Sequence, residues 1–213
     1  MKSEDVARYL QENPAFFEHH AELLSQVHVP HPHGGRAIPL VERQVVALRD
    51  KNRVLETKLG ELIRFGEEND ALGEKVHRLA LALIAARDLD ALLAVLDLNL
   101  REDFSVPHVA VRLWRGNPPV IEGEPVSAEM IDYAAQLDQP YCGPAANPEA
   151  VRWFGEAAPH VRSCACVRLA DESGVFGMLV LGAEDPQRFY PEMGVLYLRR
   201  IGELAAATIA RLL

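Results

Sequence analysis

The sequence predicts an α+β domain that follows a long helix, and three patterns lead to this fold class. Apolar residues recur at helical spacing from Val41 to Leu83, over a longer stretch than anywhere else in the chain. Short stretches between Val106 and Leu181 then alternate apolar with polar residues, as strands with two unlike faces do. A last apolar stripe at helical spacing follows Pro191. Helices that flank an antiparallel sheet are typical of an α+β domain.

The first half of the long helix carries a heptad repeat, with Glu, Lys and Arg on its flanks. The d positions are Val41, Leu48, Leu55 and Leu62, and the a positions are Val45, Asn52 and Leu59. Leucine at d with one asparagine at a favours two parallel strands, because two facing Asn side chains can bond each other in only one register. We therefore expect residues 40–70 to form a coiled-coil dimerisation helix. An ordinary amphipathic helix packed on its own domain is the alternative.

The repeat changes phase after Leu62, where one interval is shortened. Gly60, Gly66 and Gly73 also weaken the helix in this region, each by up to about 1 kcal/mol relative to Ala. We expect the helix to leave its twin here and to join a globular domain that covers residues 71–213.

The first 39 residues predict a small helical headpiece and a linker. One helix is expected from Ser3 to Gln11, and Asn13-Pro14 is a typical start for a second. The headpiece has too few apolar residues for a core of its own, so it should pack on the long helix or on a partner chain. Residues 27–35 alternate proline with histidine and end in two glycines, which indicates an exposed linker and no metal site.

Within residues 71–213 the pattern predicts helices and strands in a fixed order. The expected elements are a helix capped near Asp88, a strand from Val106 to Arg115, a short strand at Val120-Ile121, a helix capped by Ser127, a short helix opened by Asn147-Pro148, a strand from Val161 to Leu169, a central strand from Val175 to Leu181, and a final helix that begins at Pro191.

Composition and charge exclude some classes of binding partner. The 213 residues carry 31 acidic and 22 basic side chains, giving a net charge of −9, and the basic residues are interleaved with acidic ones. Binding to a nucleic-acid backbone needs a concentrated positive surface, so we expect no nucleic-acid partner. No apolar run approaches the length of a membrane span, and the N-terminus does not resemble a signal peptide. We expect a cytoplasmic protein with no membrane partner and three reduced cysteines.

Several segments resemble known families. Residues 174–194 read GVFGMLVLGAEDPQRFYPEMG and resemble the closing hairpin of GAF domains, where a Gly- and Leu-rich strand leads through an acidic-Pro turn to Phe and the last helix. The segments Asn13–Phe17, Pro30-His31 and Leu40–Gln44 are similar, in that order, to an uncharacterised bacterial family catalogued as domain of unknown function 484. This similarity covers nearly the whole chain. It implies a GAF-like fold in a family without an established activity.

The sequence departs from the known chemistries of GAF domains. Bilin-attaching members resemble one another in a Cys-His pair, but no cysteine here precedes a histidine. The Asn-Lys-Phe-Asp-Glu signature of members that bind cyclic nucleotides is also missing. Because the common catalytic motifs are missing as well, we expect a protein that is not an enzyme and requires no cofactor.

One face of the predicted sheet is the best candidate for a ligand site. If the two alternating strands share a sheet, their second faces bring two cations and an indole together, which suits an anion or a heterocycle. These residues are Arg112, Trp114, Cys164, Cys166 and Arg168, with Tyr141, Cys142 and Trp153 on the covering segments as a lid. The alternative is that both arginines lie in solvent and the other residues fill the core.

The cysteines allow a different class of function. Some GAF-like proteins reduce free methionine sulfoxide, and here Cys142 would have to resolve a sulfenic acid formed on Cys164 or Cys166. We favour a homodimeric sensory or regulatory module that binds a small molecule. Since no output domain follows Leu213, a protein partner should read its state. A purely structural adaptor is the remaining alternative.

Overall fold

The computed structural model describes residues 2–26, 28–30, 37–115 and 125–213. The chain divides into two compact units, Met1–Glu67 and Glu68–Leu213, and the division falls inside one long helix.

The first unit consists of short elements and the start of the long helix. Its helices are α1 (Ser3–Glu12), α2 (Phe16–His19) and α3 (Ala21–Gln26). No residue of α1 or α2 is buried, so these two helices contribute no core of their own.

The expected linker contains a small sheet, which is a correction to the sequence interpretation. Strand β1 (His28–Pro30) pairs antiparallel with β2 (Ala37–Pro39). Proline is tolerated because both strands of a two-stranded sheet are edge strands, where a missing N–H need not break a ladder. Residues 31–36, which hold two of the three histidines, lie outside the described residues.

Helix α4 (Leu40–Ala85) confirms the predicted long helix. In its first part the large apolar side chains are exposed, among them Leu48, Leu55 and Leu62. Within the second unit the same helix buries Val76 and Leu79 in the core. This part of the helix therefore belongs to the core of the second unit.

The second unit is built on a four-stranded antiparallel sheet. Its strands are β3 (His108–Leu113), β4 (Tyr141–Pro144), β5 (Ser163–Asp171) and β6 (Gly174–Ala183), in the spatial order β3-β6-β5-β4. Strand β6 is central and almost wholly buried, as its apolar sequence predicted. The strand predicted at Val120-Ile121 lies outside the described residues.

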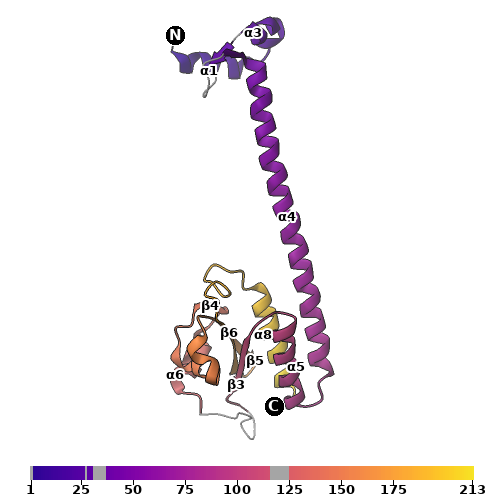
Figure 1. Ribbon diagram of the computed structural model, residues 1–213, viewed down its shortest axis with the longest axis vertical. Helices are drawn as coiled ribbons and strands as arrows, with labels where there is room; N and C mark the ends of the chain where they lie inside the picture. The colour runs from indigo at the N-terminus through magenta and orange to yellow at the C-terminus, as the bar shows by residue number, and fades with distance from the viewer. Residues whose placement is uncertain (1, 27, 31–36, 116–124) are drawn as a thin grey trace. The chain divides into compact units, whose positions relative to one another are not determined.

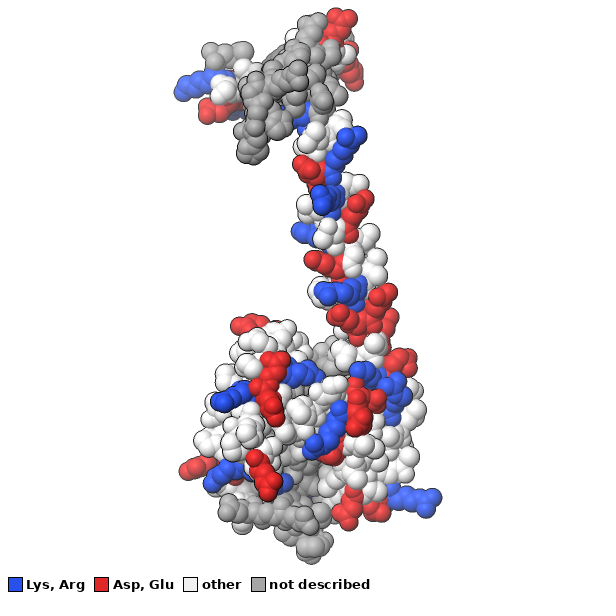
Figure 2. Space-filling model, in the orientation of Figure 1, with Lys and Arg blue, Asp and Glu red and all other residues white. Residues whose placement is uncertain are grey.

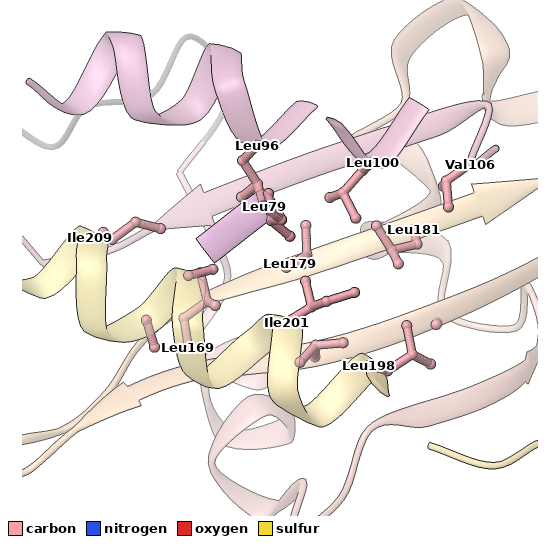
Figure 3. Packing of buried hydrophobic residues seen from close by; sticks show 14 of the residues in the cluster. Leu79, Leu96, Leu100, Val106, Leu169, Leu179, Leu181, Leu198, Ile201 and Ile209 are labelled. Carbon is pink, nitrogen blue, oxygen red and sulfur yellow. The ribbon is translucent and has the colours of Figure 1, made fainter. Parts of the chain in front are cut away.

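Helices cover the two faces of this sheet unequally (Figure 1). The end of α4 packs with α5 (Leu89–Glu102) and α8 (Leu196–Ala210) on one face, around a leucine-rich core (Figure 3). The other face is covered by α6 (Ala128–Gln136) and α7 (Pro148–Arg152), and the 3-10 helix Gly155–His160 follows α7 along the chain. The mixed α+β fold is the one that the sequence predicted.

Local signals placed most helix starts correctly. The Asp88 carboxylate accepts a hydrogen bond from the Ala91 N–H at 2.8 Å and caps α5. Ser127 and Asn147 cap α6 and α7 in the same way. The last helix starts at Leu196, not at Pro191, because the chain first makes a turn in which the Met193 N–H donates to the Tyr190 carbonyl.

Candidate functional site

The candidate residues on β3 and β5 share one face of the sheet, as predicted. Arg112 of β3 and Arg168 of β5 both pair with Met178 of β6, so the three form one row across the sheet. Cys166 lies in the next row, opposite Val180. Neighbouring strands are about 4.8 Å apart, which places the two arginine Cα atoms roughly 10 Å apart on either side of Met178.

Arg112 is half-buried and stacks on an aromatic ring. Its guanidinium lies 5.6 Å from the centre of the Trp153 ring, and one N–H donates to the Val111 carbonyl at 3.1 Å. Burial lowers the pKa of Arg112, since the charged form loses hydration. In the described part of the chain no carboxylate pairs with this guanidinium.

Aromatic side chains surround the same face. The Trp114 indole N–H donates to the Val175 carbonyl at 3.0 Å, which fixes the ring against the sheet. Trp114, Tyr141 and Trp153 are partly buried against the cluster that contains both strand cysteines.

Two covering helices are joined by a contact that the sequence interpretation missed. The Ser127 N–H at the start of α6 donates to a carboxylate oxygen of Glu149 in α7 at 3.0 Å, and the Ser127 hydroxyl donates to the other oxygen. Ser127 entered the prediction only as a helix-start signal, which gave no hint of its contact with Glu149, 22 positions away. The contact holds α6 and α7 together over the site.

Cys164 and Cys166 form a buried thiol pair. Each is 1% exposed, and the Cys164 thiol donates to the Pro144 carbonyl at 3.8 Å. The closeness of the two thiols lowers the pKa of Cys164, whose thiolate the neighbouring thiol would stabilise, and raises the pKa of Cys166. Tyr133 of α6 also contacts Cys166, and burial raises the pKa of Tyr133. Sequence reasoning missed Tyr133, although it lies three positions after the buried Met130 on one helix face.

Cys142 does not join this group, and its expected place in the lid is wrong. In β4 it pairs with Ala165, so its side chain points to the opposite face and packs in the leucine-rich core. Burial raises the pKa of Cys142 to about 11. The sheet therefore lies between Cys142 and the other two thiols. Arg168 is also set apart, because it lines a separate cavity at the sheet edge.

Comparison with protein families identifies the chain. The sequence model of the family described as "Protein of unknown function, DUF484" matches residues 1–213. The chain belongs to the DUF484 family. A search of curated proteins found no match to the sequence.

Solved structures that resemble this DUF484 chain are GAF domains and related folds. The GAF domain of a phosphoenolpyruvate-protein phosphotransferase from Coxiella burnetii is 15% identical, with a TM-score of 0.51, and the alignment covers 66% of this chain and 93% of that chain. A free methionine-R-sulfoxide reductase from Neisseria meningitidis, solved in complex with its substrate, is 15% identical with a TM-score of 0.50. Its alignment covers 66% of this chain and 89% of that chain. At this identity the likeness shows the fold, which is GAF-like.

Other types of site find no support in the described residues of the DUF484 chain. Among them, no group of three or more His, Cys, Asp or Glu side chains is placed to hold a metal ion. No described helix is both long and apolar enough to cross a membrane. On the face shown in Figure 2, acidic and basic side chains alternate along α4 and over the second unit, as the sequence indicated.

Proposed function

We propose that this chain is a non-catalytic, homodimeric GAF-like module that binds a small anionic or aromatic molecule and passes its bound state to a protein partner. The observation that carries the proposal is Arg112, a half-buried cation that stacks on Trp153 and has no carboxylate partner in the described part of the chain.

The unpaired charge supports a ligand for a physical reason. A guanidinium that loses hydration costs free energy unless a counter-charge replaces the water. The Trp153 ring offsets about 0.5–2 kcal/mol of this cost. An anion would offset more, and a planar guanidinium suits the two oxygens of a carboxylate or phosphate.

The first part of α4 supports a second copy of the chain as partner. Leu48, Leu59 and Leu62 are 65%, 58% and 66% exposed in the single chain. Burying each leucine would contribute about 1.5–3 kcal/mol. The heptad repeat specifies a coiled coil, and in a parallel pair Lys51 at g would face Glu56 at e of the other helix.

The redox alternative is less well supported. The substrate-bound reductase from Neisseria meningitidis indicates that this fold can hold a small molecule. The chemistry considered for this chain, however, needs Cys142 to meet Cys164 or Cys166, and these thiols lie on opposite faces of the sheet.

A ligand screen on the full chain tests the proposal. Thermal shifts with nucleotides, small carboxylates and aromatic acids should identify a compound that raises the melting temperature at fixed protein concentration. Arg112→Gln should weaken the binding of that compound by about 10-fold or more, because a charge-assisted hydrogen bond contributes about 1.5–3 kcal/mol.

Arg152→Gln is the matched control, since Arg152 is an exposed arginine of the adjacent helix α7. A ligand that binds Arg112→Gln as tightly as the native chain would refute the site, and no stabilising compound would favour the structural adaptor.

A further inference from the structure

The outer edge of β5 is open beyond the end of β4. The pairing of these strands ends at Tyr141 and Cys166, whereas β5 continues to Asp171. The chain before β4 runs alongside this edge without joining the sheet. Among the described residues, the last five of β5 therefore have no neighbouring strand on that side.

Arg168 presents unused main-chain groups at this edge. The Trp114 N–H donates to the Phe176 carbonyl, so the even-numbered residues of β6 direct their main-chain groups toward β3 and the odd-numbered ones toward β5. The odd-numbered residues of β5 pair with those, so its even-numbered residues from Cys164 to Arg168 direct their N–H and C=O toward β4. Arg168 belongs to this set. The residue in line with it is Gln139, but no main-chain hydrogen bond joins the two in the described structure.

A cavity of about 220 Å³ fills the space where that pairing would have continued. It lies between residues 137–140, the edge of β5 and one side of α8. The α8 wall is held firmly, because a Cβ atom at Gly202 would lie 2.3 Å from the nearest Val167 methyl carbon. The volume equals that of roughly seven water molecules, at about 30 Å³ each.

Charges of both signs line the cavity. Arg168 and Arg199 contribute two cations, and Asp138 and Glu203 contribute two carboxylates. Arg199 and Glu203 approach only to 3.8 Å. Neither Arg168 nor Asp138 makes a side-chain hydrogen bond or ion pair with any described residue. This balance disfavours a ligand with net negative charge and suits one that carries both charges.

We propose that this edge cavity binds a free α-amino acid as a zwitterion. The amino acid would take the place of the missing strand residue opposite Arg168. Its carboxylate would accept from the Arg168 N–H and guanidinium, and its ammonium group would donate to the Arg168 carbonyl and to Asp138 or Glu203. The site is separate from Arg112 and Trp153, so it does not depend on the function proposed above.

Calorimetric titration of the full chain with the standard amino acids tests this site. One amino acid, or a small group of them, should bind, whereas the matching amine and the matching carboxylic acid should not. Arg168→Gln should weaken binding by about 10- to 100-fold. Arg200→Gln, on the same helix as Arg199 but outside the cavity, should leave binding unchanged.

A second measurement avoids dependence on variants that fold poorly. In the native chain, the bound amino acid should slow hydrogen exchange of the Arg168 amide, because that N–H gains an acceptor. The proposal is overturned if no amino acid binds at millimolar concentration. It is overturned equally if binding survives Arg168→Gln, or if the exchange of the Arg168 amide does not change.

Discussion

Arg112 is a half-buried cation for which the described residues supply no counter-ion. It is partly buried without a counter-ion, whereas Arg101 pairs with Asp97 at 2.8 Å and also donates to the Pro107 carbonyl at 2.6 Å. Two arginines of one domain therefore differ in what their charge contributes. Residues retained against stability are common at binding sites.

Replacing each arginine with methionine separates these two roles. Arg112→Met should leave the free energy of unfolding unchanged or raise it by up to about 1 kcal/mol, because the uncompensated charge is removed. Arg101→Met should lower it by about 1 kcal/mol, because hydrogen bonds are lost. Urea unfolding of the ligand-free chain measures both. A loss of several kcal/mol in Arg112→Met would mean that this arginine is mainly structural.

Cys142 makes stability depend on alkaline pH. Its pKa rises from 9.0 to about 11 in the folded chain, so between these values the unfolded chain releases the thiol proton first. Stability contributed by the protonated thiol is complete below pH 9.0 and is lost as the pH rises to about 11. The loss should reach about 2–3 kcal/mol. Urea unfolding from pH 8 to 11 should show a smaller decline in Cys142→Ala, and identical declines would contradict the buried thiol.

The sequence could predict which residues of one strand share a face of the sheet, but not how neighbouring strands pair. Alternation along β5 placed Cys164, Cys166 and Arg168 on one face correctly, because the face of a residue within a strand is a local property. The face of Cys142 and the open edge at Arg168 depend on the register and the end of β4. Both result from pairing between segments about 25 positions apart, which no local pattern encodes.

At the scale of elements, α4 contains two stretches with different surroundings. Its residues from Val76 onward pack into the sheet domain, whereas the leucines of the heptad repeat face solvent in the single chain. The change of phase after Leu62 predicted this division. Short-range patterns of this kind also gave the caps of α5, α6 and α7, but the start of α8 was wrong because a turn from Tyr190 to Met193 precedes it.

The heptad face can be tested with two neighbouring residues of equal exposure. Leu55 at d is 54% exposed and Val54, outside the seam, is 55% exposed. Leu55→Glu should raise the dimer dissociation constant by at least about 100-fold. The substitution removes one leucine from each helix of the pair and places two carboxylates close together at the seam. Val54→Glu should change it little. Analytical ultracentrifugation measures both, and equal effects would contradict the assigned seam.

At the scale of the whole molecule, the proposed dimer and the sheet domain occupy different units. Both apolar clusters described around the sheet consist of residues that follow Glu68. The described core contacts of its helices, including those of α4 from Val76 onward, are therefore made within the second unit. We infer that its folding does not require the heptad segment.

A fragment of residues 68–213 should consequently fold alone and sediment as a monomer. Its melting temperature should not vary with protein concentration, whereas that of the full chain should rise with concentration, because association stabilises only folded chains. The fragment should also keep the amino-acid site on β5, since every residue that lines the cavity lies within it.

Scanning calorimetry over a concentration series, combined with sedimentation, distinguishes a monomeric fragment from a dimeric full chain. A fragment that dimerises as tightly as the full chain would place the main interface on the sheet domain, and a full chain that stays monomeric at micromolar concentration would leave α4 without the partner that its leucines require.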